Sequence, residues 1–160
     1  MTTQSIYHLS LVAHITGLTL MAGTTVVQFI IFQKFRKLVI ADHSKGIIIL
    51  ESTSRLPMLL GLGIILLIVS GVSMMAITHG AFGEQIWFRI KFGLVIIIII
   101  NGLAIGRRQQ VKLRKLLDEK TSGNLIEARL AKLEKNIDYF HFIQLGLFLT
   151  VFVLSVFKFN

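Results

Sequence analysis

The sequence predicts an all-α integral membrane protein, a four-helix transmembrane bundle, and three features of the chain predict this class. The 160 residues are 54% hydrophobic and only 16% charged, whereas soluble domains are about 45–50% apolar and about 25% charged. The apolar residues gather in four stretches that contain no charged residue, at 1–33, 56–83, 92–106 and 139–157. A helix needs about 20 mostly apolar residues to cross a bilayer, and the isoleucine run at 96–100 lacks the alternation of barrel strands.

The uncharged stretches place four spans within one domain, 1–160, and we expect them at about 6–33, 56–78, 86–107 and 138–158. The third span includes Arg89 and Lys91 close to its start, where their long stems can reach the interface. Pro57 begins the second span, at a position where a helix tolerates proline. The first span does not resemble a cleaved signal peptide, because no basic segment precedes it and its apolar core is too long.

The distribution of basic residues predicts the orientation of the bundle. The connection 34–55 contains five Lys and Arg residues, the connection 107–138 contains nine, and the rest of the chain contains three. Because basic loops stay in the cytoplasm, we expect both termini and the turn at 79–85 outside the cytoplasm, with the protein in the inner membrane. The net charge of +9 is then a topology signal with affinity for anionic lipid. We expect the lipid bilayer, not nucleic acid, as its partner.

The connection 107–138 has apolar residues at helical intervals on both sides of Ser122-Gly123-Asn124, which supplies a break and an N-cap. The spacing predicts that spans three and four extend into the cytoplasm as an antiparallel helical hairpin. A solvated, charged connector with weak packing is the alternative that this pattern leaves open.

Polar residues inside the spans are costly, so each requires a partner or a role. At about 100° per residue, one face of span one carries His14, Gly17, Met21, Thr25 and Gln28. Small and polar residues also share one face of span two, with Gly63, Ser70 and Ser73, and one face of span three, with Asn101 and Gly102. These faces predict a bundle interior in which helices approach closely. For Gln28, Asn101 and Gln144 we expect hydrogen bonds between helices.

His14, Lys91 and Ser73 lie at about the same depth in the outer half of the predicted bundle. His14 is either a cofactor or metal ligand or a hydrogen-bonding group between helices, and Lys91 either faces the interior or extends to the interface. We expect Met21 and Thr25, which share the face of His14, to contribute to the same site. Three further histidines are secondary: His8 and His79 lie near the outer rim, where a metal pair stays open, and His141 is expected to pair with Asp138.

Three short segments resemble a group of small bacterial membrane proteins that includes the membrane-bound protoporphyrinogen oxidase and the copper-resistance D-type proteins. They are the histidine-bearing first span leading into Met21-Ala22-Gly23, the segment 87–91 (Trp-Phe-Arg-Ile-Lys), and the segment 101–104 (Asn-Gly-Leu-Ala) followed by two arginines. In the oxidase family a span-one histidine binds haem and a span-three lysine is important for activity. The resemblance therefore implies haem b as cofactor, His14 as its ligand and a role for Lys91.

Two hypotheses about function follow. In the first, the protein is haem-binding or redox-associated through His14; in the second, it is a non-catalytic scaffold or a subunit of a larger membrane complex. A small transporter fits less well, because no carboxylate occurs in 56–83 or 85–117. The small-residue faces leave a homo-oligomer open. The absence of cysteine excludes a disulfide framework and a thiolate metal site.

Overall fold

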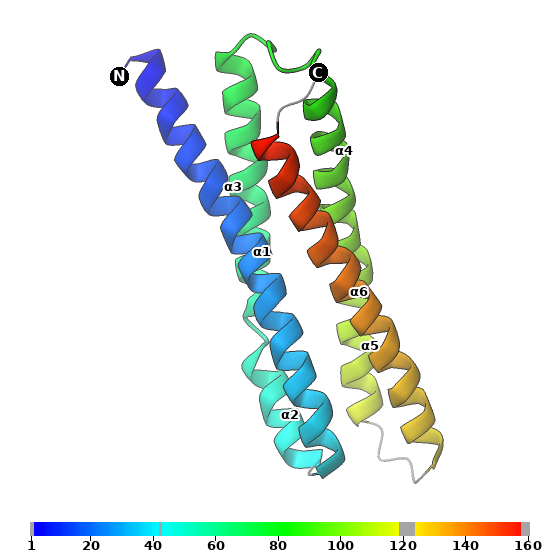
Figure 1. Cartoon of the computed structure of the whole chain (residues 1–160). Coiled ribbons are helices and arrows are strands. Elements are labelled where there is room, and N and C mark those ends of the chain that lie inside the picture. The colour runs from blue at the N-terminus through cyan, green and yellow to red at the C-terminus, as the bar shows by residue number, and fades with distance from the viewer. Residues whose placement is uncertain (1, 42, 119–123, 158–160) are drawn as a thin grey trace.

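The computed structural model describes residues 2–41, 43–118 and 124–157, and within these residues the chain is helical and contains no strand. Four helical stretches are long and apolar enough to cross a membrane. Successive stretches run antiparallel, and the start of the first stretch and the end of the last lie at the same end of the molecule, here called the terminal end (Figure 1). The predicted all-α, four-helix architecture is confirmed.

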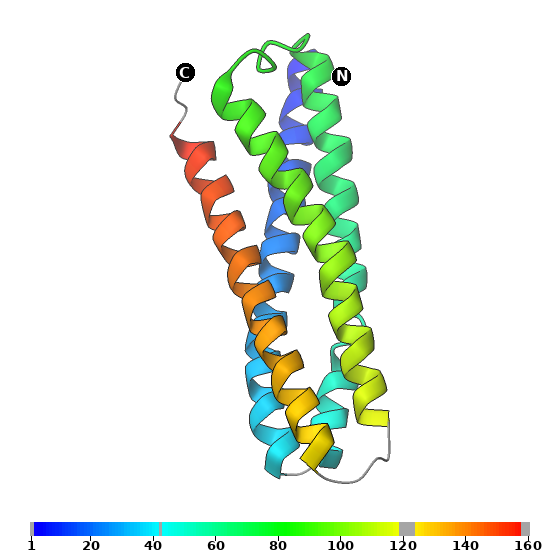
Figure 2. The same cartoon turned by 90° about the vertical axis from the view of Figure 1, so that its right-hand side faces the viewer.

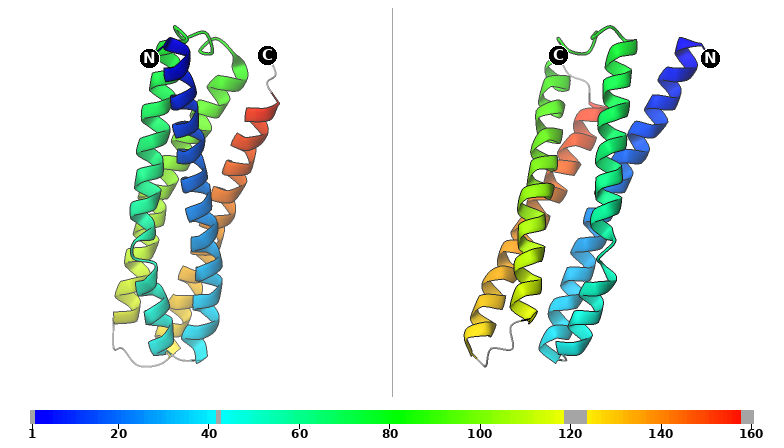
Figure 3. Two further views of the ribbon diagram at one scale, coloured as in Figure 1. Left: turned by 90° about the vertical axis from the view of Figure 1, so that its left-hand side faces the viewer. Right: turned by 180° about the vertical axis from the view of Figure 1, so that it is seen from behind.

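Helices α1 (Thr3–Ala41) and α3 (Leu56–Ile77) form the first antiparallel pair (Figure 3). They cross at two glycines that touch through their backbones. A Cβ added to Gly17 would lie 2.8 Å from the carbonyl oxygen of Gly63, and one added to Gly63 would lie 2.9 Å from that of Gly17. Real Cβ atoms essentially never come so close to backbone, so both positions require glycine. The predicted close approach of the first two spans is confirmed here.

The second pair consists of α6 (Asn124–Val156) beside one long rod, which is formed by α4 (Ile86–Ile100), η1 (Asn101–Gly106) and α5 (Arg107–Asp118) (Figure 2). The middle element η1 is a π-helix, which the sequence pattern did not predict, and such segments occur frequently at functional sites. Gly106, its last residue, faces the ring of Phe140 on α6, whose Cζ would lie 2.8 Å from an added Cβ. A turn with positive φ at His79 and Gly80 joins α3 to α4 at the terminal end.

All four spans meet in one central core, which makes the two pairs a single bundle. Its buried members are contributed by α1, α3, α4 and α6 and are Leu18, Met21, Ile64, Leu67, Ile98, Phe148 and Val151. The outer surfaces of the same helices are apolar as well, with Val12, Val69 and Phe142 each more than 60% exposed. Apolar side chains on the outside as well as the inside are what a bilayer requires of a protein surface.

The opposite end of the bundle, here called the hairpin end, is also packed. Helix α2 (His43–Ser52) folds back along α1, and α5 lies against α6 (Figure 1). A second core joins them, formed by Phe32, Phe35, Val39, Leu113 and Ile137. The predicted helical hairpin is confirmed, and the alternative of a weakly packed connector is not observed. The break predicted at 122–123 lies outside the described residues. Helices α1 and α6 also continue beyond the predicted limits of their spans, to Ala41 and from Asn124.

Candidate functional site

His14 is held against α3 by a hydrogen bond to Ser70. Its Nδ1 lies 3.1 Å from Ser70 Oγ. The Ser70 hydroxyl donates its own hydrogen to the carbonyl of Leu66, so it accepts the hydrogen bond from His14 Nδ1–H. The same edge of the ring packs on Gly71, where an added Cβ would lie 3.5 Å from Cε1. The contacts with α3 therefore orient the imidazole, through Ser70, Gly71 and a hydrogen bond to the backbone of Leu67.

Lys91 approaches this histidine from the second pair of helices. It lies on α4, is half-buried, and its charge acts electrostatically on His14. The two ionisable residues that the sequence placed at one depth are therefore near enough for the charge of Lys91 to act on His14. Together with Ser70 they form a small polar group, from α1, α3 and α4, in the terminal half of the bundle; we call His14, Ser70 and Lys91 the His14 site.

The other predicted site residues have separate partners. Ser73 pairs with Ser10, with 2.9 Å between the two hydroxyl oxygens. Met21 is 1% exposed in the central core, and Thr25 donates to the Met21 carbonyl at 2.9 Å. Met21 lies about 10 Å farther along the helix from His14, at about 1.5 Å per residue. Met21 therefore packs in the central core and Thr25 bonds to the backbone of α1, although both share a helix face with His14.

Sequence reasoning placed Ser70 on an interior face but did not identify it as the partner of His14. The signal lies in the antiparallel register of α1 and α3. Gly17 packs against the backbone of Leu67 as well as that of Gly63, and from the Gly17–Leu67 contact each step toward the start of α1 meets a residue farther along α3. His14 therefore meets Ser70, and Ser10 meets Ser73.

A second polar contact joins α4 and α6 beside the π-helix. Asn101 Nδ2 donates to Gln144 Oε1 at 2.7 Å, and Gln144 Nε2 donates to the carbonyl of Ile98 at 3.0 Å. Gln144 is only 1% exposed, so its amide group is satisfied entirely within the bundle. The hydrogen bonds between helices that we predicted for these two residues are observed.

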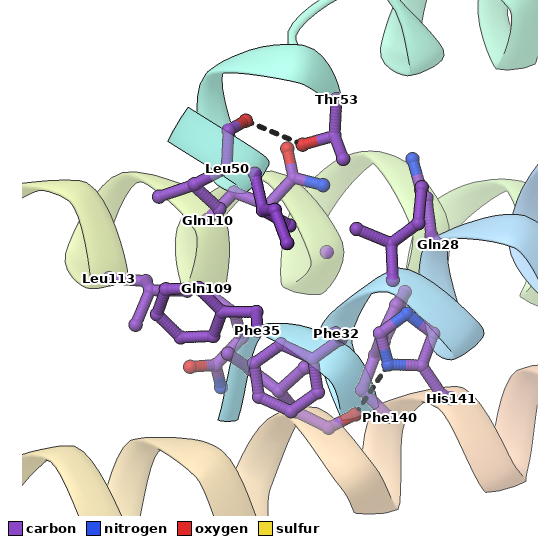
Figure 4. Close-up of a pocket in the computed structure, with 14 residues that line it drawn as sticks. Gln28, Phe32, Phe35, Leu50, Thr53, Gln109, Gln110, Leu113, Phe140 and His141 are labelled. Carbon is purple, nitrogen blue, oxygen red and sulfur yellow. Dashed lines mark hydrogen bonds between the residues drawn. The ribbon is translucent and has the colours of Figure 1, made fainter. Parts of the chain in front are cut away.

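His141 lines a small cavity near the hairpin end, which Figure 4 shows in close-up. Its Nδ1 donates to the carbonyl of Ile137 at 2.8 Å, and its ring lies among Phe29, Phe32 and Phe140. The cavity has a volume of about 50 Å³, and its polar lining comes from Gln28, Thr53, Gln109, Gln110 and His141. Since one water needs about 10–15 Å³ of such volume, this cavity holds a few waters and has no room for an organic cofactor.

The predicted pairing of His141 with Asp138 is wrong, because Asp138 belongs to a contact between α1 and α6. One of its carboxylate oxygens accepts from Gln33 Nε2 at 2.8 Å, and the other pairs with Arg36. Arg36 also lies 3.8 Å from Glu134. These four residues tie the two longest helices together at the hairpin end.

Within the described part of the chain, no group of three or more histidine, aspartate or glutamate side chains is placed to hold a metal ion. His8 is exposed and its ring meets Tyr7 edge-on, and His79 lies exposed in the turn after α3.

Comparison with known proteins gives the chain a family. Residues 8–159 match the family described as "Predicted integral membrane protein (DUF2269)". The chain belongs to this family. Its description agrees with the four apolar helices and names no substrate, cofactor or activity. No curated protein and no solved structure matches the chain.

Proposed function

We propose that this integral membrane protein holds a haem of the b type in the terminal half of its bundle, with His14 as an axial ligand. The observation that carries the proposal is the hydrogen bond from His14 Nδ1 to Ser70. It orients the ring, and Nε2 is the atom that would coordinate the iron in the neutral imidazole. Histidines that bind metals almost always donate their other ring N–H to such a partner. The resemblance of the first and third spans to haem-associated membrane proteins supports the same assignment.

The side chains present fit haem better than a bare metal ion. A structural or catalytic zinc site takes three or four protein ligands, and no such group occurs among the described residues. A porphyrin supplies four nitrogens itself and needs one or two axial ligands from the protein. Lys91 is the second side chain that we assign to the cofactor, as a sixth ligand or as the cationic partner of a propionate. When bound, the haem would supply one-electron redox chemistry.

A non-catalytic role is the second candidate, and a specific observation favours it. Polar side chains of the spans form hydrogen-bonded pairs between helices. These pairs are Ser10 with Ser73, His14 with Ser70, and Asn101 with Gln144. Pairs of this kind stabilise helix contacts in membranes by about 0.6–2 kcal/mol. In this reading His14 holds α1 to α3, and the chain is a scaffold, a homo-oligomer or a subunit of a larger membrane complex.

The proposal includes an orientation in the inner membrane. Basic residues are concentrated at the hairpin end, in 34–55 and 107–138, and basic segments remain on the cytoplasmic side. The hairpin end then lies in the cytoplasm and both termini lie outside it. The His14 site is consequently in the half of the bilayer that is farther from the cytoplasm.

The test is a haem titration of the detergent-purified protein, followed by absorbance, with His14→Ala beside His141→Ala. Both variants remove an imidazole from a membrane helix, but only His14 belongs to the proposed site. We expect a saturable Soret band for the wild type and for His141→Ala, and none for His14→Ala. A folded, monodisperse wild type that stays colourless in excess haem would reject the cofactor and leave the scaffold in its place.

A further inference from the structure

A second site is suggested by a groove at the hairpin end, between α5 and α6. The groove has a volume of about 340 Å³, and four basic side chains line it, two from each helix. They are Lys112 and Lys115 on α5 and Arg129 and Lys132 on α6. The uncharged polar residues Gln109 and Asn136 complete the polar lining, and Leu116 and Leu133 provide its apolar part. We call this the basic groove.

The electrostatics of the basic groove are one-sided. No carboxylate is among the lining residues that the structure describes, and no ion pair within the described parts of the chain involves its four cations. Other cations of the same region are engaged elsewhere, since Arg36 pairs with Asp138 and Lys135 lies over the ring of Tyr139. Four like charges around one groove repel one another, and a bound anion would remove that cost.

We propose that the basic groove binds a phosphate-bearing anion. Lysine and arginine are the side chains that recognise phosphate, as point charges and as planar donors respectively. The amides of Gln109 and Asn136 can add neutral donors. The volume of the groove is at the lower end of the range of about 300–1,000 Å³ that is typical of small-ligand sites. These features suit a phosphate group with a small polar substituent.

The position of the groove allows this phosphate to belong either to a membrane lipid or to a soluble compound. Helix α5 continues directly from the third span, and Lys112 follows Arg107 by about 8 Å along the helix, at about 1.5 Å per residue. The polar layer of a bilayer extends for several ångströms beyond its hydrocarbon core, which is about 30 Å thick. An anionic phospholipid headgroup and a soluble phosphate compound can therefore both reach the groove.

The test uses two probes on the full-length protein in neutral detergent. Native mass spectrometry measures retention of phosphatidylglycerol against phosphatidylcholine, and calorimetry measures binding of inorganic pyrophosphate. The groove variant is Lys112→Gln with Lys132→Gln. The matched control is Arg114→Gln with Lys135→Gln, which removes the same charge from the same two helices at positions that do not line the groove. All four side chains are exposed, so both double variants are expected to fold.

We expect the wild type to bind at least one probe and the groove variant to bind it about tenfold more weakly or worse, whereas the control changes little, because each cation near an anionic surface contributes about 1 kcal/mol. Retention of phosphatidylglycerol identifies a lipid headgroup as the ligand, and binding of pyrophosphate alone identifies a soluble phosphate. Equal weakening in both double variants would show only diffuse charge attraction and would overturn the proposal. Failure of the wild type to bind either probe would overturn it as well.

Discussion

Gly17 and Gly63 determine how closely α1 and α3 approach, and this contact sets the partners of the polar residues nearby. Because Gly17 touches the backbones of Gly63 and Leu67 there, the antiparallel register of the two helices is fixed at this point. His14 then faces Ser70, and Ser10 faces Ser73. The same contact that packs the first pair of helices therefore orients the proposed haem ligand.

The glycine contact gives the first prediction. Gly63→Ala is expected to lower the free energy of unfolding by about 1–3 kcal/mol, because the new Cβ overpacks the contact with the Gly17 carbonyl and the side chain of Met21. Gly61→Ala is the control, since a Cβ there meets nothing within 4 Å. Thermal unfolding in detergent measures both. Equal melting temperatures for the two variants would contradict the close approach.

A second prediction concerns the orientation of His14. Ser70→Ala removes the acceptor of the Nδ1–H hydrogen bond and is expected to weaken haem affinity by about 10–100-fold, as the loss of such partners does in other metal sites. Ser73→Ala removes a hydroxyl from the same face of α3 but pairs with Ser10, so it should leave the affinity unchanged. Haem titrations of the two variants compare them directly. A larger loss of haem affinity in Ser73→Ala than in Ser70→Ala would contradict the role of Ser70 in orienting His14.

At the level of whole helices, the sequence predicts what the bilayer and the helical period dictate. Uncharged stretches locate the four spans, and helically spaced leucines indicate the hairpin. What it does not predict depends on contacts between distant segments. Asp138 is one turn before His141 and looked like its partner, but Arg36 of α1 pairs with it and the histidine bonds to the carbonyl of Ile137.

The same limit applies to the π-helix and to the cavity beside His141. The segment Asn101–Gly106 has no local sequence feature that distinguished it from regular helix, although Gln144 of α6 bonds at its start. The cavity is lined by α1, α2, α5 and α6 together with η1. No pattern within a single helix reports such a space.

The packed hairpin makes a prediction about α5. Leu113 is 1% exposed and joins the second core, whereas Val111 on the same helix is 46% exposed. Leu113→Ala is expected to cost about 2–5 kcal/mol through lost burial and the cavity that it leaves. Val111→Ala should change stability little. Chemical unfolding of the two variants distinguishes them, and a tolerant Leu113 would mean that α5 is not held against the bundle.

The two ends of the whole molecule differ in their polar groups, and the proposed orientation in the membrane assigns each end to one side. The hairpin end holds the ion cluster around Asp138 and the basic groove, whereas the terminal end holds the His14 site. With the hairpin end in the cytoplasm, this arrangement would place phosphate recognition on the cytoplasmic side and the haem within the half of the bilayer that is farther from the cytoplasm.

Reporter fusions test that orientation. An alkaline phosphatase fusion after Asn160 is expected to be active, and one inserted near Gly123 inactive, because the basic connections stay in the cytoplasm. A green fluorescent protein fused at the same two positions should give the inverse pattern. Activity of the phosphatase near Gly123 would reverse the orientation and place the His14 site in the cytoplasmic half.

We propose above that His14 binds haem in an otherwise ordinary four-helix membrane bundle. Haem content per chain, measured by the pyridine haemochrome assay on protein purified without added haem, tests it most directly. We expect stoichiometric haem in the wild type and in His141→Ala, and essentially none in His14→Ala with its helical content and monodispersity intact. Haem retained in His14→Ala, or absent from a folded wild type that was expressed with sufficient haem, would contradict it.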